Sequence, residues 1–122
     1  MTAEAKIQND IRVALSAHGC TIIRTNTGSV RTADGRMFNA GPPNGWPDLC
    51  GMVHSTGQII LIECKNETGK LREDQKRFGK MVTKMVPNAI YGVCRSADDA
   101  IKLIDRGIEH DRQRIVEASK RL

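Results

Sequence analysis

The sequence predicts an α/β fold in which a central mixed sheet is flanked by helices, with the element order αβββαβα. Two observations predict it: segments with apolar residues at every third or fourth position, and short β-branched and apolar runs between them. The chain has 122 residues, of which 39 % are hydrophobic and 27 % are charged, as is typical of a globular domain. We therefore expect residues 1–122 to form a single domain. No apolar run approaches the ~20 residues that span a bilayer.

Three segments have the apolar spacing of amphipathic helices. They cover residues 3–18, 70–86 and 97–106. Gly19 and Pro87 follow the first two at positions where helices end, and Ser96 is a favourable cap for the third. We expect Gly107 to break that last helix and residues 108–122 to form a charged, helical extension.

Four short segments are predicted to be strands because they are rich in β-branched and apolar residues. They cover residues 20–26, 48–54, 58–65 and 89–94. The turn at 55–57 joins the second and third as a hairpin. The continuous apolar run 59–62 predicts a strand that is covered on both faces. Residues 27–47 are rich in Gly and Pro and are predicted to form a long loop, which in a small domain is usually functional or disordered.

The net charge and the residue composition favour a protein with a polyanionic partner and argue against a zinc-knuckle or base-stacking protein. Nineteen Lys and Arg against 14 Asp and Glu give a net charge of +5 and a pI near 9.3, which favours a polyanionic partner. The four cysteines lack the spacing of a zinc knuckle, so we expect reduced, buried thiols in a cytoplasmic protein. The N-terminus lacks the order of a signal peptide. Aromatic residues are too few for a platform that stacks single-stranded bases.

Two polar residues lie on otherwise apolar helix faces. At about 100° per residue, Glu4 falls on the same stripe as Ile7, and a carboxylate directed at a core is costly unless it is paired or bound to a metal. Alternatively, Glu4 is exposed at the helix start, where the helix dipole favours it. Gln75 lies beside Phe78 on the apolar face of its helix. It is either a hydrogen-bonded structural amide or a residue that reaches into a site.

A pair of charged residues lies at the C-terminal end of the third predicted strand. Glu63 and Lys65 are two residues apart, so they project from the same face; taken alone, they are explained by a salt bridge. Asp48 follows Pro47 at the start of the neighbouring strand. The hairpin between the two strands can therefore bring Asp48 and Glu63 together at one end of the sheet.

Two adjacent carboxylates stay ionised at neutral pH only if positive charge lies between them. Oxygen ligands favour Mg²⁺ or Mn²⁺ over zinc. Lys65 would then position or activate a water held by the cation, or stabilise a phosphorane by its charge. Carboxylates, a lysine, a cation and a basic surface together predict hydrolysis of phosphodiester bonds.

These residues resemble the PD-(D/E)xK nuclease superfamily, with its restriction-endonuclease-like fold. More closely, residues from about 3 to 95 resemble the stand-alone VRR-NUC (virus-type replication-repair nuclease) domain. The matching elements in chain order are Glu4, Arg24–Gly28, Gly45–Asp48, Ile62–Lys65, Thr68–Leu71 and Gln75. Residues 96–122 match no such element and would complete the fold or form a dimer interface.

The resemblance implies a role for each matching position. The implied metal ligands are the side chains of Glu4, Asp48 and Glu63 and the backbone carbonyl of Cys64. Glu4 would bind directly or through water, Lys65 would be the catalytic lysine, and Gln75 would orient the ligands. The implied activity is a Mg²⁺- or Mn²⁺-dependent DNA endonuclease without a small-molecule cofactor.

The resemblance also implies branched DNA as the substrate. VRR-NUC domains are similar to Holliday-junction resolvases, and small stand-alone members resemble phage or prophage proteins of DNA repair, which would work in the host cytoplasm. Symmetric cutting of a four-way junction needs two sites, and hence a homodimer. The alternatives are a flap-cutting or general endonuclease of the same fold, a non-catalytic DNA-binding module, and a metal-free interaction domain in which Glu63 and Lys65 form a structural pair.

Basic residues predict where DNA is bound. Residues 65–86 carry seven basic and three acidic side chains, and phosphate contacts of this kind give salt-dependent binding without base readout. The candidate DNA-binding residues are Arg24, Asn26, Arg31, Arg36, Lys70 and Lys76. Asn26 is equally compatible with a turn, and Trp46 is expected to pack beside the site rather than to stack on bases.

Overall fold

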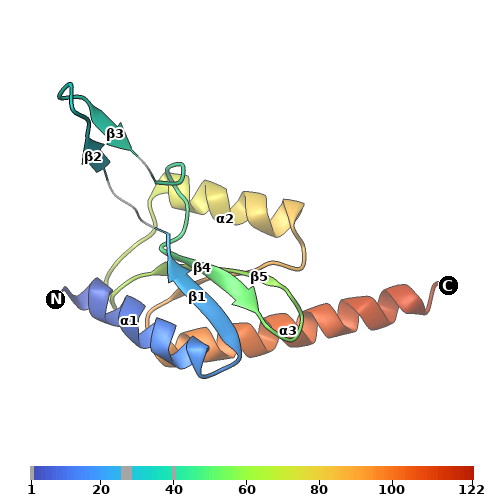
Figure 1. Ribbon diagram of the computed structural model, residues 1–122. Helices are drawn as coiled ribbons and strands as arrows, with labels where there is room; N and C mark the ends of the chain where they lie inside the picture. The colour runs from blue at the N-terminus through green and yellow to red at the C-terminus, as the bar shows by residue number, and fades with distance from the viewer. Residues whose placement is uncertain (1, 26–28, 40) are drawn as a thin grey trace.

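The computed structural model describes residues 2–25, 29–39 and 41–122 (Figure 1). The helices are α1 (Ala3–Ser16), α2 (Glu73–Met85) and α3 (Ala97–Ser119). The strands are β1 (Cys20–Arg24), β2 (Ser29–Arg31), β3 (Met37–Asn39), β4 (Leu49–Val53), β5 (Ile59–Cys64) and β6 (Ile90–Cys94). No helix in the described ranges is long and apolar enough to cross a membrane.

Four strands form the central sheet, in the order β1-β4-β5-β6. The pairs β1–β4 and β4–β5 are antiparallel, and β6 runs parallel to β5, so the predicted mixed sheet is confirmed. The turn at 55–57 joins β4 and β5 as predicted. Helices α1 and α3 cover one face of the sheet and α2 covers the other (Figure 1).

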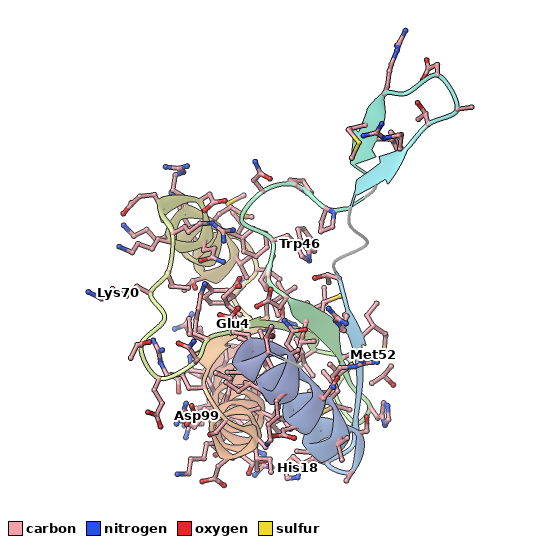
Figure 2. The ribbon with its side chains drawn as sticks, turned by 90° about the vertical axis from the view of Figure 1, so that its left-hand side faces the viewer. Glu4, His18, Trp46, Met52, Lys70 and Asp99 are labelled. Atoms are coloured by element: carbon pink, nitrogen blue, oxygen red, sulfur yellow. The ribbon has the colours of Figure 1, made fainter. Side chains whose placement is uncertain are left out.

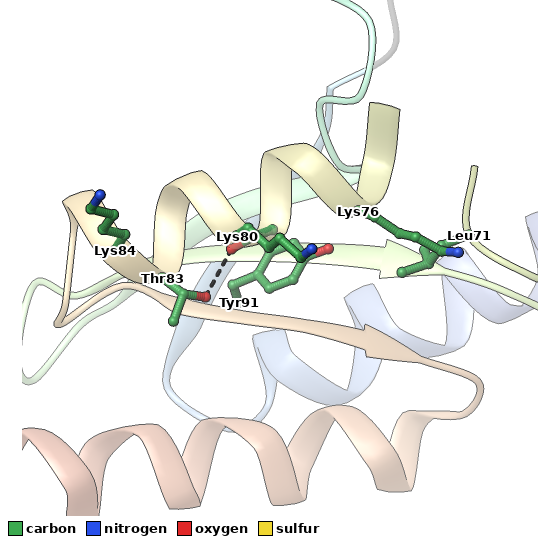
Figure 3. A pocket seen from close by; sticks show the side chains of 7 residues that line it. Leu71, Lys76, Lys80, Thr83, Lys84 and Tyr91 are labelled. Atoms are coloured by element: carbon green, nitrogen blue, oxygen red, sulfur yellow. Dashed lines mark hydrogen bonds between the residues drawn. The ribbon is translucent and has the colours of Figure 1, made fainter. Parts of the chain in front are cut away.

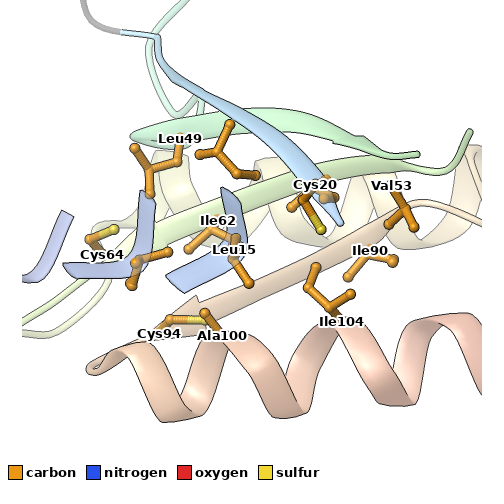
Figure 4. Close-up of a cluster of buried hydrophobic side chains, with 13 residues drawn as sticks. Leu15, Cys20, Leu49, Val53, Ile62, Cys64, Ile90, Cys94, Ala100 and Ile104 are labelled. Carbon is orange, nitrogen blue, oxygen red and sulfur yellow. The ribbon is translucent and has the colours of Figure 1, made fainter. Parts of the chain in front are cut away.

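The hydrophobic core lies between the sheet and helices α1 and α3 (Figure 4). Ile11 and Leu15 of α1 and Ile104 of α3 are fully buried there. Burial of such side chains contributes about 1.5–3 kcal/mol each. The four cysteines are free thiols; three are buried as expected, whereas Cys50 is only half-buried.

The predicted break at Gly107 is wrong, because α3 runs without interruption from Ala97 to Ser119. The missing side chain serves packing instead. A Cβ at Gly107 would lie 2.5 Å from Cγ1 of Ile90, so glycine lets α3 approach β6. The Ser96 cap is confirmed, since its side chain accepts a hydrogen bond from the backbone N–H of Asp99 at 3.1 Å.

The predicted loop 27–47 contains a two-stranded hairpin, β2–β3, that projects from the body of the fold (Figure 1). Gly35 adopts a φ of 86° at its turn, a conformation that favours glycine. The side chain of Thr32 donates a hydrogen bond to the Asp34 carboxylate. Met37 and Phe38 are exposed. The hairpin was missed because three-residue strands are too short to show a period.

Two further boundaries differ from the expectation. The run 60–62 is buried, but Ile59 is 51 % exposed, because α2 packs over the β6 side of the sheet and leaves the β1 side open (Figure 1). Helix α2 begins at Glu73 and not at residue 70. The residues before it form a turn around Asn66, whose Oδ1 accepts a hydrogen bond from the backbone N–H of Gly69 at 2.7 Å.

Candidate active site

The two carboxylates of Asp48 and Glu63 meet on the α2 side of the sheet. Leu49 of β4 pairs with Ile62 of β5, so Asp48 and Glu63 flank this pair on the opposite face of the pleat. The Oδ2 atom of Asp48 accepts a hydrogen bond from the backbone N–H of Cys64 at 2.9 Å. The hairpin therefore brings the two carboxylates together, as the spacing predicted.

Glu63 is the carboxylate whose pKa is shifted most strongly in this site. It is 2 % exposed, and burial together with the adjacent, negatively charged Asp48 carboxylate raises its pKa to about 8. The positive charges of Lys65 and Arg72 act in the opposite direction. Its Oε2 atom is buried and has no hydrogen-bond partner, although an unpaired buried polar atom is costly. A ligand that neutralises this carboxylate would remove both costs.

Gln75 holds the other oxygen of the same carboxylate. Its Nε2 donates a hydrogen bond to Oε1 of Glu63 at 2.9 Å, and its Oε1 accepts one from the backbone N–H of Arg72 at 2.8 Å. The side chain is 4 % exposed. Gln75 thus combines the two roles left open by the sequence, because it caps α2 and also orients Glu63.

Lys65 and Glu4 complete the surroundings of the pair. Lys65 is 9 % exposed, and its backbone N–H donates to the carbonyl of Cys94 at 3.2 Å, which extends the parallel ladder. Glu4 lies in the first turn of α1, half-buried, on the side towards α2 (Figure 2). Its charge is the smallest of the causes that raise the pKa of the Cys64 thiol, after burial and the charges of Asp48, Cys94 and Glu63. Glu4 therefore lies near the strand end that carries the carboxylates.

The donor set of the pair fits a hard divalent cation. Within residues 2–25, 29–39 and 41–122, no three His, Cys, Asp or Glu side chains gather closely enough to hold a metal ion by themselves. Asp48 and Glu63 supply two adjacent carboxylates, one with the unpaired Oε2. Cations such as Mg²⁺ are usually held by one or two carboxylates and keep several waters. The residues present thus suit Mg²⁺ or Mn²⁺, with Glu4 too distant for a three-carboxylate cage.

A small pocket opens beside Asp48. It has a volume of about 200 Å³ and is lined by Thr25, by the segment 41–48 and by Arg72. Trp46 in this segment packs on Phe78 with ring centroids 5.1 Å apart, as expected. The pocket places the Arg72 guanidinium next to Asp48, although no sequence pattern singles out this residue.

The predicted DNA-binding residues are dispersed over the surface. Arg24 is exposed at the end of β1 and pairs in register with Leu49. Arg31 and Arg36 belong to the projecting hairpin, away from the carboxylates (Figure 1). Lys70 extends into solvent before α2 (Figure 2). Asn26 lies outside the described residues.

Lys76 lies in a basic groove that the sequence did not predict (Figure 3). The groove has a volume of about 500 Å³ and is lined by Leu71, Lys76, Gly79, Lys80, Thr83, Lys84 and Tyr91. A Cβ at Gly79 would lie 2.7 Å from the Tyr91 ring, so the glycine inside α2 was the available signal. The charge of Glu63 contributes, after burial, to a raised pKa of Tyr91, which places the groove near the carboxylates.

A mixed sheet that presents an Asp, a Glu and a Lys at one end, under a helix glutamine, defines the PD-(D/E)xK class of nuclease folds. The family model of the VRR-NUC domain matches residues 2–98, and the chain belongs to this nuclease family. A solved structure described as a VRR_NUC domain is 24 % identical in sequence, with a TM-score of 0.61. The match covers 86 % of this chain and 97 % of that one. No curated protein matches the chain.

Proposed function

We propose that this protein is a Mg²⁺- or Mn²⁺-dependent DNA endonuclease that cuts branched DNA, with the four-way junction as its preferred substrate. The carboxylate of the buried Glu63, which has one oxygen without a partner and lies beside the half-buried Asp48, is the observation that carries the proposal. Two adjacent carboxylates both stay ionised at neutral pH only if positive charge lies between them, and a divalent cation supplies that charge. A structural Glu63–Lys65 pair would not need Asp48 beside it.

Asp48 and Glu63 would hold the cation, with the backbone carbonyl of Cys64 and, through water, Glu4. When bound, the cation supplies Lewis-acid activation for attack on a phosphodiester. Gln75 donates to Oε1 of Glu63 and so leaves Oε2 free to bind. Lys65 is buried beside the pair, where its ammonium group would stabilise negative charge that develops on the phosphoryl oxygens.

Basic side chains around the site would hold the phosphate backbone. Lys76, Lys80 and Lys84 follow one another at intervals of four residues along the groove (Figure 3). These intervals span about 12 Å of helix, a length of three to four nucleotides of one strand at about 3.4 Å each. Arg72 lines the pocket beside Asp48, and the exposed Lys70 precedes the groove residue Leu71 in the chain. Arg24 and the hairpin arginines would contact more distant parts of a branched substrate.

A homodimer would supply the two sites that symmetric cutting needs. The half of the sheet that α2 leaves open carries three exposed apolar side chains, Ile23, Met52 and Ile59, with exposed fractions of 54, 53 and 51 %. Met52 and Ile59 are partners in register. Apolar patches of this kind often mark interaction surfaces. The role in DNA repair and the host-cytoplasmic location remain predictions.

The test is a comparison of labelled substrates under single-turnover conditions with Mg²⁺. A four-way junction, a 5′ flap and a plain duplex of matched length are incubated with equal enzyme, and the nicks are mapped on each strand. The proposal predicts paired, symmetric nicks at the junction and much slower cutting of duplex. Equal cutting of all three would refute the junction preference. Light scattering gives the mass, and a monomer on the junction would refute the dimer.

A further inference from the structure

The segment that follows Lys65 lies against the stem of this lysine. Residues 65–72 contain no helix or strand, yet the backbone of Gly69 packs on the Lys65 side chain. A Cβ at Gly69 would lie 3.2 Å from Cδ of Lys65 and 3.1 Å from Oδ1 of Asn66. The turn therefore restricts where the ammonium group of Lys65 can point.

Asn66 determines the shape of this turn. Its Oδ1 accepts hydrogen bonds from the backbone N–H groups of Thr68 at 3.2 Å and of Gly69 at 2.7 Å. Such a side-chain-to-backbone turn is a common local arrangement. These bonds close the turn on itself, but they do not attach it to the sheet.

Arg95 makes that attachment. Its Nη1 donates hydrogen bonds to the carbonyl of Asn66 and, at 2.9 Å, to the carbonyl of Gly69. These are the two ends of the turn, and a charged donor makes each bond stronger than a neutral one. Arg95 itself is fixed because it follows Cys94 of β6 and its backbone N–H donates to Oδ2 of Asp99 at 2.9 Å.

Arg95, which follows β6, thus contacts the turn 66–69, and this turn itself contacts the side chain of Lys65. Strand β6 also holds Lys65 from the other side, through the bond from the backbone N–H of Lys65 to the carbonyl of Cys94. Consecutive residues, Cys94 and Arg95, therefore hold the backbone of the lysine and the turn that covers its side chain. None of the contacts of Arg95 involves a carboxylate of the pair.

We propose that Arg95 is a positioning residue for Lys65: it clamps the turn 66–69 onto the lysine stem and so directs the ammonium group to the carboxylate pair. This inference rests on the proposed nuclease function. Arg95 acts on the reacting atoms only through the turn and Lys65, so its loss should slow the chemical step without weakening DNA binding.

The test compares Arg95→Ala and Arg95→Lys with Arg112→Ala, a matched loss of an exposed arginine whose partner is Glu109 on the surface of α3. Arg95→Ala is expected to lower kcat roughly 10- to 100-fold, as small misplacements at a site do, with KM for DNA and the urea midpoint unchanged. Arg95→Lys should recover part of the rate, and so should guanidinium ions added at low concentration to Arg95→Ala. An unchanged kcat, or an equal loss in Arg112→Ala, would overturn the positioning role.

A second measurement reports on the clamp without activity. Hydrogen exchange at the amides of Thr68 and Gly69 should accelerate in Arg95→Ala, in the absence of metal and DNA. Unchanged exchange would overturn the clamp. Faster exchange in a protein whose wild type cuts no DNA would refute the proposed function and leave the clamp standing. Gly69→Ala, which presses on the same stem, should lower kcat in the same way while Arg95 is intact.

Discussion

Without a divalent cation, Glu63 should make the stability of this protein fall as pH rises. Its pKa is about 8 in the folded protein, against 4.5 for an unperturbed glutamate. Between these values the folded protein holds a proton that the unfolded chain releases. Because the folded state binds more protons, the free energy of unfolding decreases with pH across this window. The effect is absent below about pH 4.5 and complete above about pH 8.

The magnitude follows from the same two pKa values. Each pH unit between them corresponds to about 1.4 kcal/mol, so the ionised Glu63 costs about 5 kcal/mol at most. The side chain is 2 % exposed, so solvent does little to screen this cost. About 5 kcal/mol is a large share of the stability of a domain of this size.

Urea unfolding at pH 5 and at pH 9, in EDTA, measures this cost. Glu63→Gln removes the charge and keeps an oxygen for Gln75, so it is the matched reference that cancels all other titrations. We expect the wild type to lose several kcal/mol relative to Glu63→Gln between the two pH values, and Mg²⁺ to restore the loss at pH 9. If the difference in the free energy of unfolding between the two proteins is the same at pH 5 and pH 9, Glu63 is not a carboxylate whose ionisation destabilises the metal-free protein.

Three further substitutions test other parts of the account. Lys65→Met should lower the cleavage rate by about 10²-fold or more, while a binding assay shows DNA affinity near wild type. If the variant instead fails to fold and shows no specific loss of cleavage, Glu63 and Lys65 form a structural pair. Gly79→Ala should destabilise the protein by up to about 2 kcal/mol in urea unfolding, since overpacking against Tyr91 costs about 1–3 kcal/mol and the gain in helix propensity is only about 1 kcal/mol. The double variant Lys80→Glu/Lys84→Glu should weaken DNA binding and reduce the slope of log K against log salt by about 2; an unchanged slope would exclude the groove from the DNA interface.

The charge variants need a control with the same change of net charge. Lys102 and Arg106 are exposed on α3, on the opposite side of the sheet from α2 (Figure 1). Changing both to Glu lowers the net charge by the same amount. The salt slope of this control should stay at the wild-type value.

The core of the site was predictable because strand geometry is simple. The pleat puts Glu63 and Lys65 on one face whatever surrounds them, and a hairpin fixes Asp48 relative to Glu63. Gln75 was predictable as an anomaly, since an amide on an apolar helix face must find a partner. That Gln75 both caps α2 and contacts Glu63 was not predictable, because these contacts depend on how α2 packs on the sheet.

Contacts to backbone carbonyls were beyond prediction. Arg95 stands after a strand like any exposed arginine, and nothing in the sequence indicates that it reaches the turn 66–69. From the sequence alone, Arg72 is likewise expected to be an ordinary surface arginine. The continuous helix through Gly107 was missed for a related reason, because tertiary packing overrides local propensity there. The hairpin in 27–47 was missed because its three-residue strands are too short to show a period.

The most direct test of the central claim is cleavage of a labelled four-way junction by wild type and by Glu63→Ala, each in Mg²⁺, in Mn²⁺ and in EDTA. We expect nicking by the wild type with either metal, none in EDTA, and none by Glu63→Ala, which should still bind the junction. Cleavage that persists in EDTA or in Glu63→Ala would contradict the claim, as would binding by the wild type without cleavage in either metal.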